Sequence, residues 1–437
     1  MDVLVWFRSD LRVNDHPALS RAAALGAVLP VFVADPQDWA GPEAAGRHWA
    51  FVSAALAELG EDLNRLGAPL SLRQGAAAEV LPRLCRARGI RHIVSHRRAW
   101  TAPRDAELRR VLEAEGITWE EISEETPGLA PPERLTAVEG AVAGLIPPAR
   151  SLGLKDDPCP CAQGGGRRAG LQLLDSFVSG RGANAPVSSL SPLAGERSSL
   201  RLSAYLTWGL LSQAEVRAAL PGSLPPEVAK TVLARLNARR RAAGLEGAVQ
   251  KAAPLSPALA AFAEGRSGLP FADALMRYLR ATGWVNAHAR SLLASVALHH
   301  LGGDFRASGQ MLARLLTDYD PAIFWFQLQK VAAARPVDPL RAGETFDPEG
   351  RFLRRWCPEL NAVPGAYLHR PWRWSGAGSV LGRRYPEPLA DPQRALRAAA
   401  ALHRARRREE ADFAVIEDPR PFLFAPPAPN AQLTLDL

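Results

Sequence analysis

The hydrophobic pattern of this chain changes near residue 125. Before that point, short β-branched runs alternate with stretches of helical periodicity. The expected strands are Val3–Phe7, Ala27–Ala34, Leu70–Arg73, Arg91–His96 and Thr118–Ile122, and the expected helices are Arg47–Leu66, Ala77–Arg88 and Arg104–Glu115. Strands separated by helices of this length predict a parallel, doubly wound α/β sheet. This Rossmann-like layer lacks a GxGxxG fingerprint, so no dinucleotide is expected in it.

Beyond residue 171, strand patterns almost vanish and helical periods recur, which predicts an all-α second half. The expected helices are Leu173–Phe177, Leu202–Leu206, Ala214–Leu220, Pro226–Ala243, Phe271–Ala281, Ala287–Leu301, Gly309–Leu316 and Ala395–Ala411. A stretch rich in Pro and Gly separates the two halves. We therefore expect an α/β domain at 1–125, an interdomain linker at 126–170, a helical domain at 171–424 and a disordered tail at 425–437.

The chain is basic, with a net charge of +8 and a pI near 9.8. This balance fits a polyanionic partner such as nucleic acid. Lysine occurs only at positions 155, 230, 251 and 330, so arginine carries nearly all the positive charge. The same composition, rich in Ala, Gly and Pro, is also typical of a GC-rich genome, and both explanations stay open.

Cysteine use and hydropathy limit the environment of the protein. Four scattered cysteines are too few for a disulfide framework, and the Cys159-Pro160-Cys161 pair has no further ligand at metal-binding spacing, so we expect no metal. No signal-peptide pattern opens the chain, and no apolar run approaches the ~20 residues of a membrane helix. These features predict a cytoplasmic protein without a membrane partner.

Three segments resemble the photolyase/cryptochrome family. VWFRSDLRVNDHPAL at Val5–Leu19 resembles its opening strand and turn, where we interpret Asp10 and Arg12 as structural. SSLRLSAYLTWGLLS at Ser198–Ser212 and GRSGLPFADALMRYLRATGW at Gly265–Trp284 resemble its flavin-binding helices. The resemblance covers roughly residues 1–360. It implies an α/β N-terminal domain, an all-α domain that binds FAD, and a monomer.

The stretch Ser199-Leu200-Arg201-Leu202-Ser203 resembles the family segment that holds the FAD phosphates at the start of a helix. Free amides and the positive end of a helix dipole favour an anion there, and Ser199, Ser203 and Arg201 add donors. The alternative is that Ser199 is only an N-cap and Arg201 a surface residue.

A second element resembles the family's TGW-MHNRxR motif, whose side chains line the flavin and adenine. Trp284 and Arg290 match it, whereas Ala287 replaces the Asn and His288 replaces the first Arg. His288 therefore stands where the family has an arginine that donates hydrogen bonds.

Asp318 and Asp320 match the family's Asp-Gly-Asp, of which one carboxylate pairs with the retained Arg290 beside the flavin ring. A buried arginine and a buried carboxylate are tolerated only together. We therefore expect Arg290 and Asp318 to face each other. Alternatively, two carboxylates two positions apart cap a turn.

The segment after these carboxylates departs from the family. Phe324 aligns with the Asn that faces flavin N5, and a phenyl ring offers N5 no hydrogen bond. Leu328 aligns with the proximal tryptophan of the electron-transfer chain, for which Trp325 is close enough to substitute. Phe305 replaces another relay tryptophan. By resemblance, Trp325 is the candidate electron relay.

The lesion-binding helix also departs. Arg235 stands where the family has a Glu that bonds the flipped dimer, and Ala238 replaces the stacking Trp. Stacking contributes ~1–3 kcal/mol per base. Arg235, Arg239 and Arg240 would instead strengthen attraction to DNA phosphates.

The last six residues, Gln432-Leu433-Thr434-Leu435-Asp436-Leu437, resemble the hexapeptide that docks bacterial polymerases and repair proteins on the replication sliding clamp. Gln432 offers hydrogen bonds, and Leu433, Leu435 and Leu437 offer small apolar anchors. The alternative is an ordinary tail that packs on its own domain.

The resemblance implies light-dependent repair of pyrimidine dimers in DNA, in which excited reduced FAD donates an electron to the dimer and regains it after the ring splits. Two alternatives stay open: a cryptochrome-like photoreceptor that does not repair, and a non-catalytic DNA- or clamp-binding adaptor. No antenna chromophore is assigned, since the folate-contacting pair of some relatives falls near Trp100-Thr101.

Overall fold

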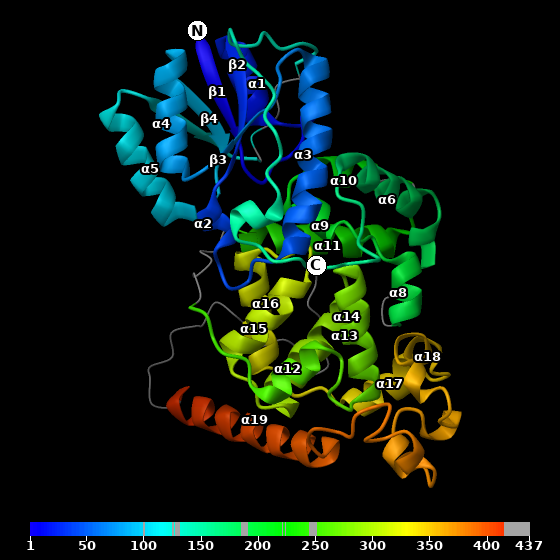
Figure 1. Ribbon diagram of the computed structural model, residues 1–437. Helices are drawn as coiled ribbons and strands as arrows, with labels where there is room; N and C mark the ends of the chain where they lie inside the picture. Colours follow the sequence, from blue (N-terminus) through cyan, green and yellow to red (C-terminus); the bar gives the residue numbers. More distant parts are fainter. Residues whose placement is uncertain are drawn as a thin grey trace. The chain divides into compact units, whose positions relative to one another are not determined.

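The computed structural model describes residues 1–98, 101–124, 126, 132–184, 191–220, 222, 224–243 and 251–414. The chain divides into two compact units (Figure 1). The first comprises Met1–Asn184, Leu200–Gln250 and Arg314–Ile323, and the second comprises Ala185–Ser199, Lys251–Ala313 and Phe324–Leu437. These units cut across the four predicted parts of the chain, whose bounds stay a prediction.

A five-stranded sheet forms the centre of the first unit. Its strands are β1 (Asp2–Phe7), β2 (Ala27–Ala34), β3 (Ser71–Gln74), β4 (His92–His96) and β5 (Thr118–Ile122). All neighbouring strands are parallel, in the order β3-β2-β1-β4-β5. The predicted doubly wound α/β layer is therefore confirmed, and each strand lies within one residue of its predicted bounds.

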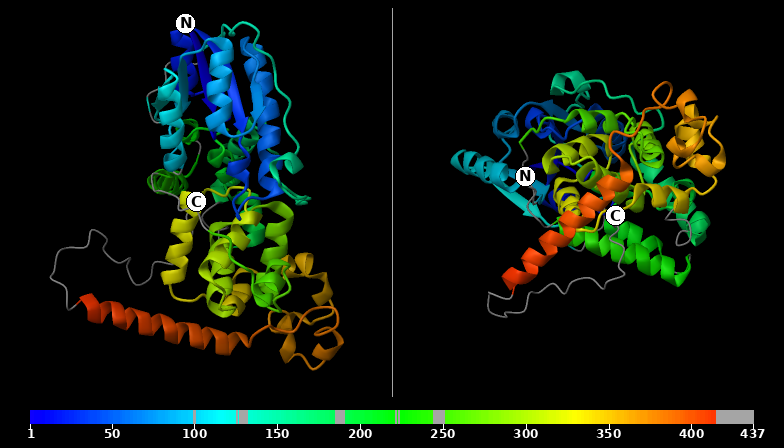
Figure 2. Two further views of the ribbon diagram at one scale, coloured as in Figure 1. Left: turned by 60° about the vertical axis from the view of Figure 1, so that its left-hand side comes forward. Right: turned by 90° about the horizontal axis from the view of Figure 1, so that it is seen from below.

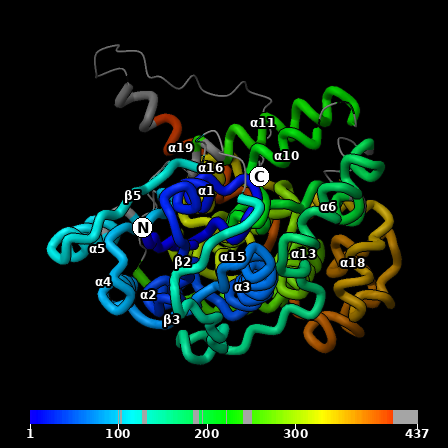
Figure 3. Tube along the Cα trace, turned by 90° about the horizontal axis from the view of Figure 1, so that it is seen from above, coloured from blue at the N-terminus to red at the C-terminus, as the bar shows by residue number. Residues whose placement is uncertain are grey.

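Helices of the first unit cover this sheet. They are α1 (Pro17–Leu25), α2 (Pro36–Trp39), α3 (Gly46–Leu66), α4 (Ala77–Arg88) and α5 (Ala102–Ala114). Because side chains alternate along a strand, Leu4 and Trp6 of β1 share one face of the sheet. They pack in one apolar core with residues of α4 and α5, which lie side by side (Figures 1 and 3).

The segment after β5 continues in the first unit. In its described part, the predicted linker is irregular apart from a short 3₁₀ turn at Ala149–Leu152. It is nevertheless tied to the sheet, since the Val28 amide donates to the Thr136 carbonyl at 2.7 Å. The helices that follow in this unit are α6 (Arg167–Ser179), α9 (Ser203–Thr207), α10 (Gln213–Ala219) and α11 (Pro226–Ala243).

The described residues of the second unit are helical, as predicted, and their longest helix is α19 (Figure 2). The helices that begin in this unit are α8 (Pro192–Ser198), α12 (Pro257–Ala263), α13 (Pro270–Thr282), α14 (Ala287–Ser295), α15 (Phe305–Leu315), α17 (Pro339–Phe346), α18 (Arg351–Trp356) and α19 (Pro392–Ala414). Helix α16 (Pro321–Ala333) begins in the first unit and continues here. No helix in the described parts of the chain has the length and apolar composition to cross a membrane.

The Gly265–Trp284 signature has a structural role. Asp273 of α13 is fully buried and accepts hydrogen bonds from the Ser267 amide at 2.8 Å, the Ser267 hydroxyl at 2.6 Å and the Gly268 amide at 2.9 Å. The hydroxyl of Tyr385 also donates to this carboxylate. Gly268 has φ +77°, and a Cβ there would lie 2.4 Å from the Glu387 carbonyl oxygen. The motif therefore fastens the segment around Tyr385 to the start of α13.

Candidate functional site

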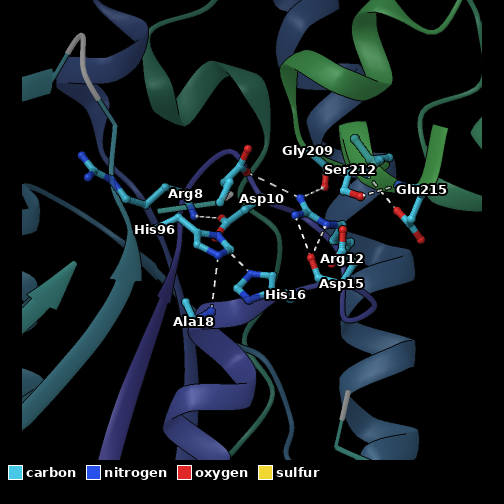
Figure 4. Close-up of polar contacts among 12 residues, drawn as sticks. Arg8, Asp10, Arg12, Asp15, His16, Ala18, His96, Gly209, Ser212 and Glu215 are labelled. Carbon is cyan, nitrogen blue, oxygen red and sulfur yellow. Dashed lines mark hydrogen bonds and ion pairs between the residues drawn. The ribbon is translucent and has the colours of Figure 1, made fainter. Parts of the chain in front are cut away.

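Open α/β sheets bind ligands at the carboxyl ends of their strands, where the strand order reverses. In the first unit this point lies between β1 and β4. Three buried side chains occupy it: Asp10 after β1, His96 at the end of β4, and His16 just before α1 (Figure 4).

Hydrogen bonds fix the state of each member of this Asp10–His16–His96 cluster. Oδ1 of Asp10 accepts the Arg8 amide at 2.6 Å, while Oδ2 lies 2.7 Å from His96 Nδ1 and 3.0 Å from His16 Nε2. The other nitrogen of each ring accepts an amide from the first turn of α1. The Ala18 amide donates to His96 Nε2 at 3.3 Å, and the Leu19 amide donates to His16 Nδ1 at 2.9 Å. Each ring therefore accepts at one nitrogen and presents its proton to Asp10 at the other.

The electrostatics follow from burial and this pairing. Burial alone would raise the pKa of Asp10, but the charge and hydrogen bonds of His16 and His96 hold it well below the ordinary value. Burial, together with the charge of His96, lowers the pKa of His16 to about 4 although Asp10 opposes the shift. At neutral pH the Asp10 carboxylate is therefore ionised and the imidazole of His16 is neutral.

This protonation pattern opposes both a metal and a phosphate at the cluster. Asp10, His16 and His96 form the group with metal-ligand geometry within the described ranges. A metal ion would displace the protons on His16 Nε2 and His96 Nδ1, and the resulting tautomers would direct N–H groups at the amides of Leu19 and Ala18. Those amides are also the donors that would hold a phosphate at the start of α1. The cluster thus fills the sheet's ligand position with structural side chains.

Arg12 extends this polar centre to the turn between α9 and α10. It is fully buried and donates to the carbonyls of Asp15 at 2.9 Å and Gly209 at 2.9 Å (Figure 4). The Leu11 amide donates to the Trp208 carbonyl at 3.1 Å. The DLR residues therefore join the sheet to the YLTWG segment, in agreement with the structural interpretation of Asp10 and Arg12.

The predicted phosphate-binding stretch divides between the two units. Ser199 follows α8 as its C-cap, so it does not serve as the N-cap of the next helix. Leu202 is buried and precedes α9, and Ser203 begins this five-residue helix. Arg201 has φ +58°, and its carbonyl accepts Gln163 Nε2 at 3.0 Å. Binding of phosphate by these residues stays a prediction.

The second predicted flavin element surrounds the start of α14. Trp284 is buried with its ring edge-on to Tyr278, 6.4 Å between centroids, and Asn286 caps α14 by accepting the Ala289 amide at 2.8 Å. His288 is half-buried, 6.3 Å from the Phe346 ring, and Arg290 is buried.

The two carboxylates that follow α15 belong to the first unit. Asp318 is buried, and its carbonyl accepts the Thr207 hydroxyl at 3.2 Å. Asp320 accepts the Ile323 amide at 3.2 Å, which fits the turn-capping alternative for this residue. Since Arg290 belongs to the second unit, the expected pairing of Arg290 with Asp318 stays a prediction.

Aromatic side chains of α16 form a buried group in the second unit. Trp325 lies 5.5 Å from Phe324 and 5.7 Å from Phe305 between ring centroids. Its indole packs on Gly309, where an added Cβ would lie 2.3 Å from the ring. Gln327 is buried on the same helix, and its Oε1 lacks a hydrogen-bond partner within the described residues. The relay role of Trp325 stays a prediction.

The predicted DNA contacts on α11 differ in accessibility. Arg235 is half-buried, whereas Arg239 is buried and donates to the Thr207 hydroxyl at 2.7 Å, with Asp320 at 4.0 Å. Arg239 is thus engaged inside the first unit, a placement that does not favour phosphate contact. The side chain of Arg240, together with Trp100 and the tail residues Gln432, Leu433, Leu435 and Leu437, lies outside the described residues.

Two buried polar groups of the second unit, an amide oxygen and a cation, fit FAD. A buried amide oxygen is normally hydrogen-bonded, so Gln327 marks an interior that a polar ligand would complete. The buried cation Arg290 suits an anionic one. The cofactor role of Arg290 stays a prediction from the sequence, and sequence reasoning missed the cluster at the sheet's ligand position. The sequence signal for this cluster was a pair of histidines: His96 ends the predicted strand Arg91–His96, and His16 follows the predicted strand Val3–Phe7.

Comparisons with known proteins agree with this assignment. Residues 3–155 match the family model described as DNA photolyase, and residues 229–405 match the FAD-binding domain of DNA photolyase. A deoxyribodipyrimidine photo-lyase of Streptomyces griseus is 31% identical, covering 89% of this chain and 96% of the relative. A cryptochrome DASH of Natronomonas pharaonis is 28% identical, covering 89% and 98%.

Solved structures give the same result. The fold is similar to that of a bacterial class III photolyase from Agrobacterium tumefaciens, with a TM-score of 0.80 and 26% identity over 92% of this chain and 97% of that one. The predicted architecture and the predicted cofactor, FAD, are therefore confirmed.

Proposed function

Because this chain belongs to the photolyase/cryptochrome family and carries that family's FAD-binding domain, we propose that it acts on DNA and repairs pyrimidine dimers in light. The observation that carries this proposal is the 31% identity to a deoxyribodipyrimidine photo-lyase over 96% of that enzyme's length. When bound, FAD supplies a light-excited one-electron donor.

The chain's own residues would bind and shield this cofactor. Arg290, a buried cation, would pair with an anionic group, and Trp284 would give a flat apolar wall. Phe324 and Trp325, both buried, would help to exclude water from the interior of this unit, which strengthens electrostatic contacts there. Ser203 and Arg201 would donate to the phosphates.

DNA attraction would come from the basic surface. The net charge of +8 favours a polyanion, and Arg235 and Arg240 are the residues of α11 that we propose as phosphate contacts. A cytoplasmic location, as proposed from the sequence, would place the protein with its substrate.

The test is a repair assay with a short oligonucleotide that contains one defined cyclobutane dimer. Protein whose flavin has been reduced is mixed with this oligonucleotide, and the dimer is quantified by chromatography after blue light and after an equal time in the dark. We expect loss of the dimer only in light. Unchanged dimer in a preparation that retains FAD would contradict repair.

A photoreceptor is the second candidate, and the residues that replace family positions favour it. Phe324 would not bond flavin N5, Phe305 replaces a relay tryptophan and Ala238 replaces a stacking platform. This candidate predicts light-dependent reduction of FAD without dimer loss. The third reading, a non-catalytic adaptor, predicts a protein that stays colourless after incubation with FAD.

We also propose that the tail binds the replication sliding clamp through Gln432, Leu433, Leu435 and Leu437. The QLxLxL pattern supports this partner. A full-length Leu433→Ala/Leu435→Ala variant should lose binding to purified clamp, while an Asn430→Ala control should keep it. Equal binding of both variants would contradict the proposal.

A further inference from the structure

The last described helix, α19, carries six arginines, more than any other described helix of the second unit. All six have exposed side chains, namely Arg394, Arg397, Arg404, Arg406, Arg407 and Arg408. Among the side chains that the structure describes, none forms an ion pair with these six, whereas Arg21, Arg47 and Arg109 each face a carboxylate of a neighbouring element. The guanidinium groups of the six α19 arginines are exposed and therefore accessible to a phosphate.

Helical geometry gathers four of these arginines into one row. At 100° per residue, Arg394, Arg397, Arg404 and Arg408 fall within an arc of about 80° and span about 21 Å along the axis. We name these four side chains the arginine row. The opposite face holds the helix to its unit, because Ala399 is buried and His403 Nε2 lies 3.1 Å from the Ala333 carbonyl. The row therefore points away from the unit's interior.

The composition of α19 favours a row of phosphates over a lipid surface. A helix that lies in a membrane interface needs large apolar residues on the face opposite its charges. Here that face has only two large apolar residues, Leu396 and Leu402, beside Ala395 and Ala399, and it also carries Arg406. The helix packs against the π-helix Val296–His300, and in the described part of α19 Leu402 is the large apolar side chain that is exposed. The acidic residues of α19, at 409, 410 and 412, all follow the row.

We propose that the arginine row binds the phosphate backbone of duplex DNA, as a contact that reads neither sequence nor lesion. Guanidinium groups suit phosphate oxygens, and a straight helix of this length presents them in a line (Figure 2). The choice of DNA among polyanions rests on the proposed function. The expected result is added affinity for any duplex, damaged or intact.

Salt dependence tests this directly, because each phosphate contact contributes about 0.9 to the slope of log K against log salt. The full chain is compared with an Arg394→Gln/Arg397→Gln/Arg404→Gln/Arg408→Gln variant, by fluorescence anisotropy on an undamaged duplex over a series of NaCl concentrations. We expect the magnitude of the slope to fall by about 3 to 4.

The matched control removes the same charge from the first unit. Arg83, Arg110, Arg134 and Arg150 are also exposed, and changing all four to Gln should lower the slope by less than one contact's worth, about 0.9. Equal slopes for the α19 variant and the wild type, or equal losses for both variants, would overturn the proposal. Loss of binding to phosphatidylserine vesicles with an unchanged DNA slope would also overturn it, in favour of a lipid partner.

Two further arms keep the result interpretable. If the fourfold variant does not fold, the pairs Arg394→Gln/Arg397→Gln and Arg404→Gln/Arg408→Gln should each give about half the loss. Because the duplex is undamaged, the slope is independent of repair. Failure of the repair assay with a normal loss of slope would reject the proposed function alone, and the reverse outcome would reject the arginine row alone.

Discussion

Each unit is organised around one fully buried aspartate, and the two aspartates differ in their partners. Asp10 in the first unit lies between the imidazoles of His16 and His96. Asp273 in the second unit accepts two amides and the hydroxyls of Ser267 and Tyr385. Burial opposes the charge in both places. The pKa of Asp10 nevertheless lies well below its ordinary value, whereas burial raises the pKa of Asp273.

The difference shows that the number of donors does not decide in which direction the pKa of a buried carboxylate shifts. Asp273 has four donors, but amides and hydroxyls carry no net charge and do not offset the loss of hydration. Asp10 has rings that can take up a proton, so its charge is supported. The stability of the first unit should therefore depend strongly on the charge of Asp10. The stability of the second unit should depend mainly on the hydrogen bonds that Asp273 accepts.

The largest expected effect is that of Asp10→Ala. Removal leaves two buried ring N–H groups and the Arg8 amide without an acceptor, so we expect a loss of about 3–5 kcal/mol in the free energy of unfolding. Urea unfolding of both proteins at neutral pH measures it, with the exposed Asp2→Ala as control. A loss below about 1 kcal/mol would show that the cluster does not hold the sheet edge.

The pH dependence of the first unit comes next. Folding lowers the pKa of His16 from 6.5 to about 4, so the unfolded chain binds more protons in between. The contribution of His16 to the free energy of unfolding is fully present above pH 6.5, the pKa in the unfolded chain. It falls by about 3 kcal/mol as the pH drops from 6.5 to 4. Asp273, with its raised pKa, should act in the opposite direction, because its protonated form is favoured by folding. Unfolding midpoints of wild type and His16→Asn over this range check the prediction, and an equal slope in both would contradict it.

Tyr385→Phe should have a smaller effect on the second unit. The change removes one hydroxyl donor from Asp273 and keeps the buried ring, so we expect a loss of about 1.5–2 kcal/mol. The exposed Tyr367→Phe is the matched control. Thermal unfolding of the two variants should differ in midpoint, and identical midpoints would mean that this hydrogen bond does not fasten the segment around residue 385.

Asp273→Asn should give the smallest effect, a loss of about 1 kcal/mol at pH 7. The amide oxygen keeps the Ser267 donors, and the hydroxyl of Tyr385 can accept from the new NH₂. The Gly268 amide loses its acceptor, a cost that is partly offset because a buried charge no longer has to be desolvated. The contrast with Asp10→Asn, measured in parallel, sharpens the comparison. If the two asparagine variants lose equal stability, the charge of Asp10 is not what distinguishes the units.

Sequence reasoning predicted the strands well because each is a buried, β-branched run with clear ends. It missed α1 and α2, which are short and begin at Pro17 and Pro36. The Asp10–His16–His96 cluster was missed because no local pattern reports that residues 10 and 96 meet at a strand switch. The DNA contact of Arg239 stays a prediction, and its hydrogen bond to Thr207, 32 residues away in sequence, is a contact that no local pattern reports.

The helical unit is expected to hold FAD, although Phe324 and Ala287 stand where the photolyase/cryptochrome family has asparagines that line the flavin. The most direct test is the absorbance spectrum of the full chain after incubation with FAD and removal of free flavin by gel filtration. We predict that flavin absorbance elutes with the protein in a ratio near one per chain. Colourless protein with all flavin in the low-molecular-weight fractions would contradict the account.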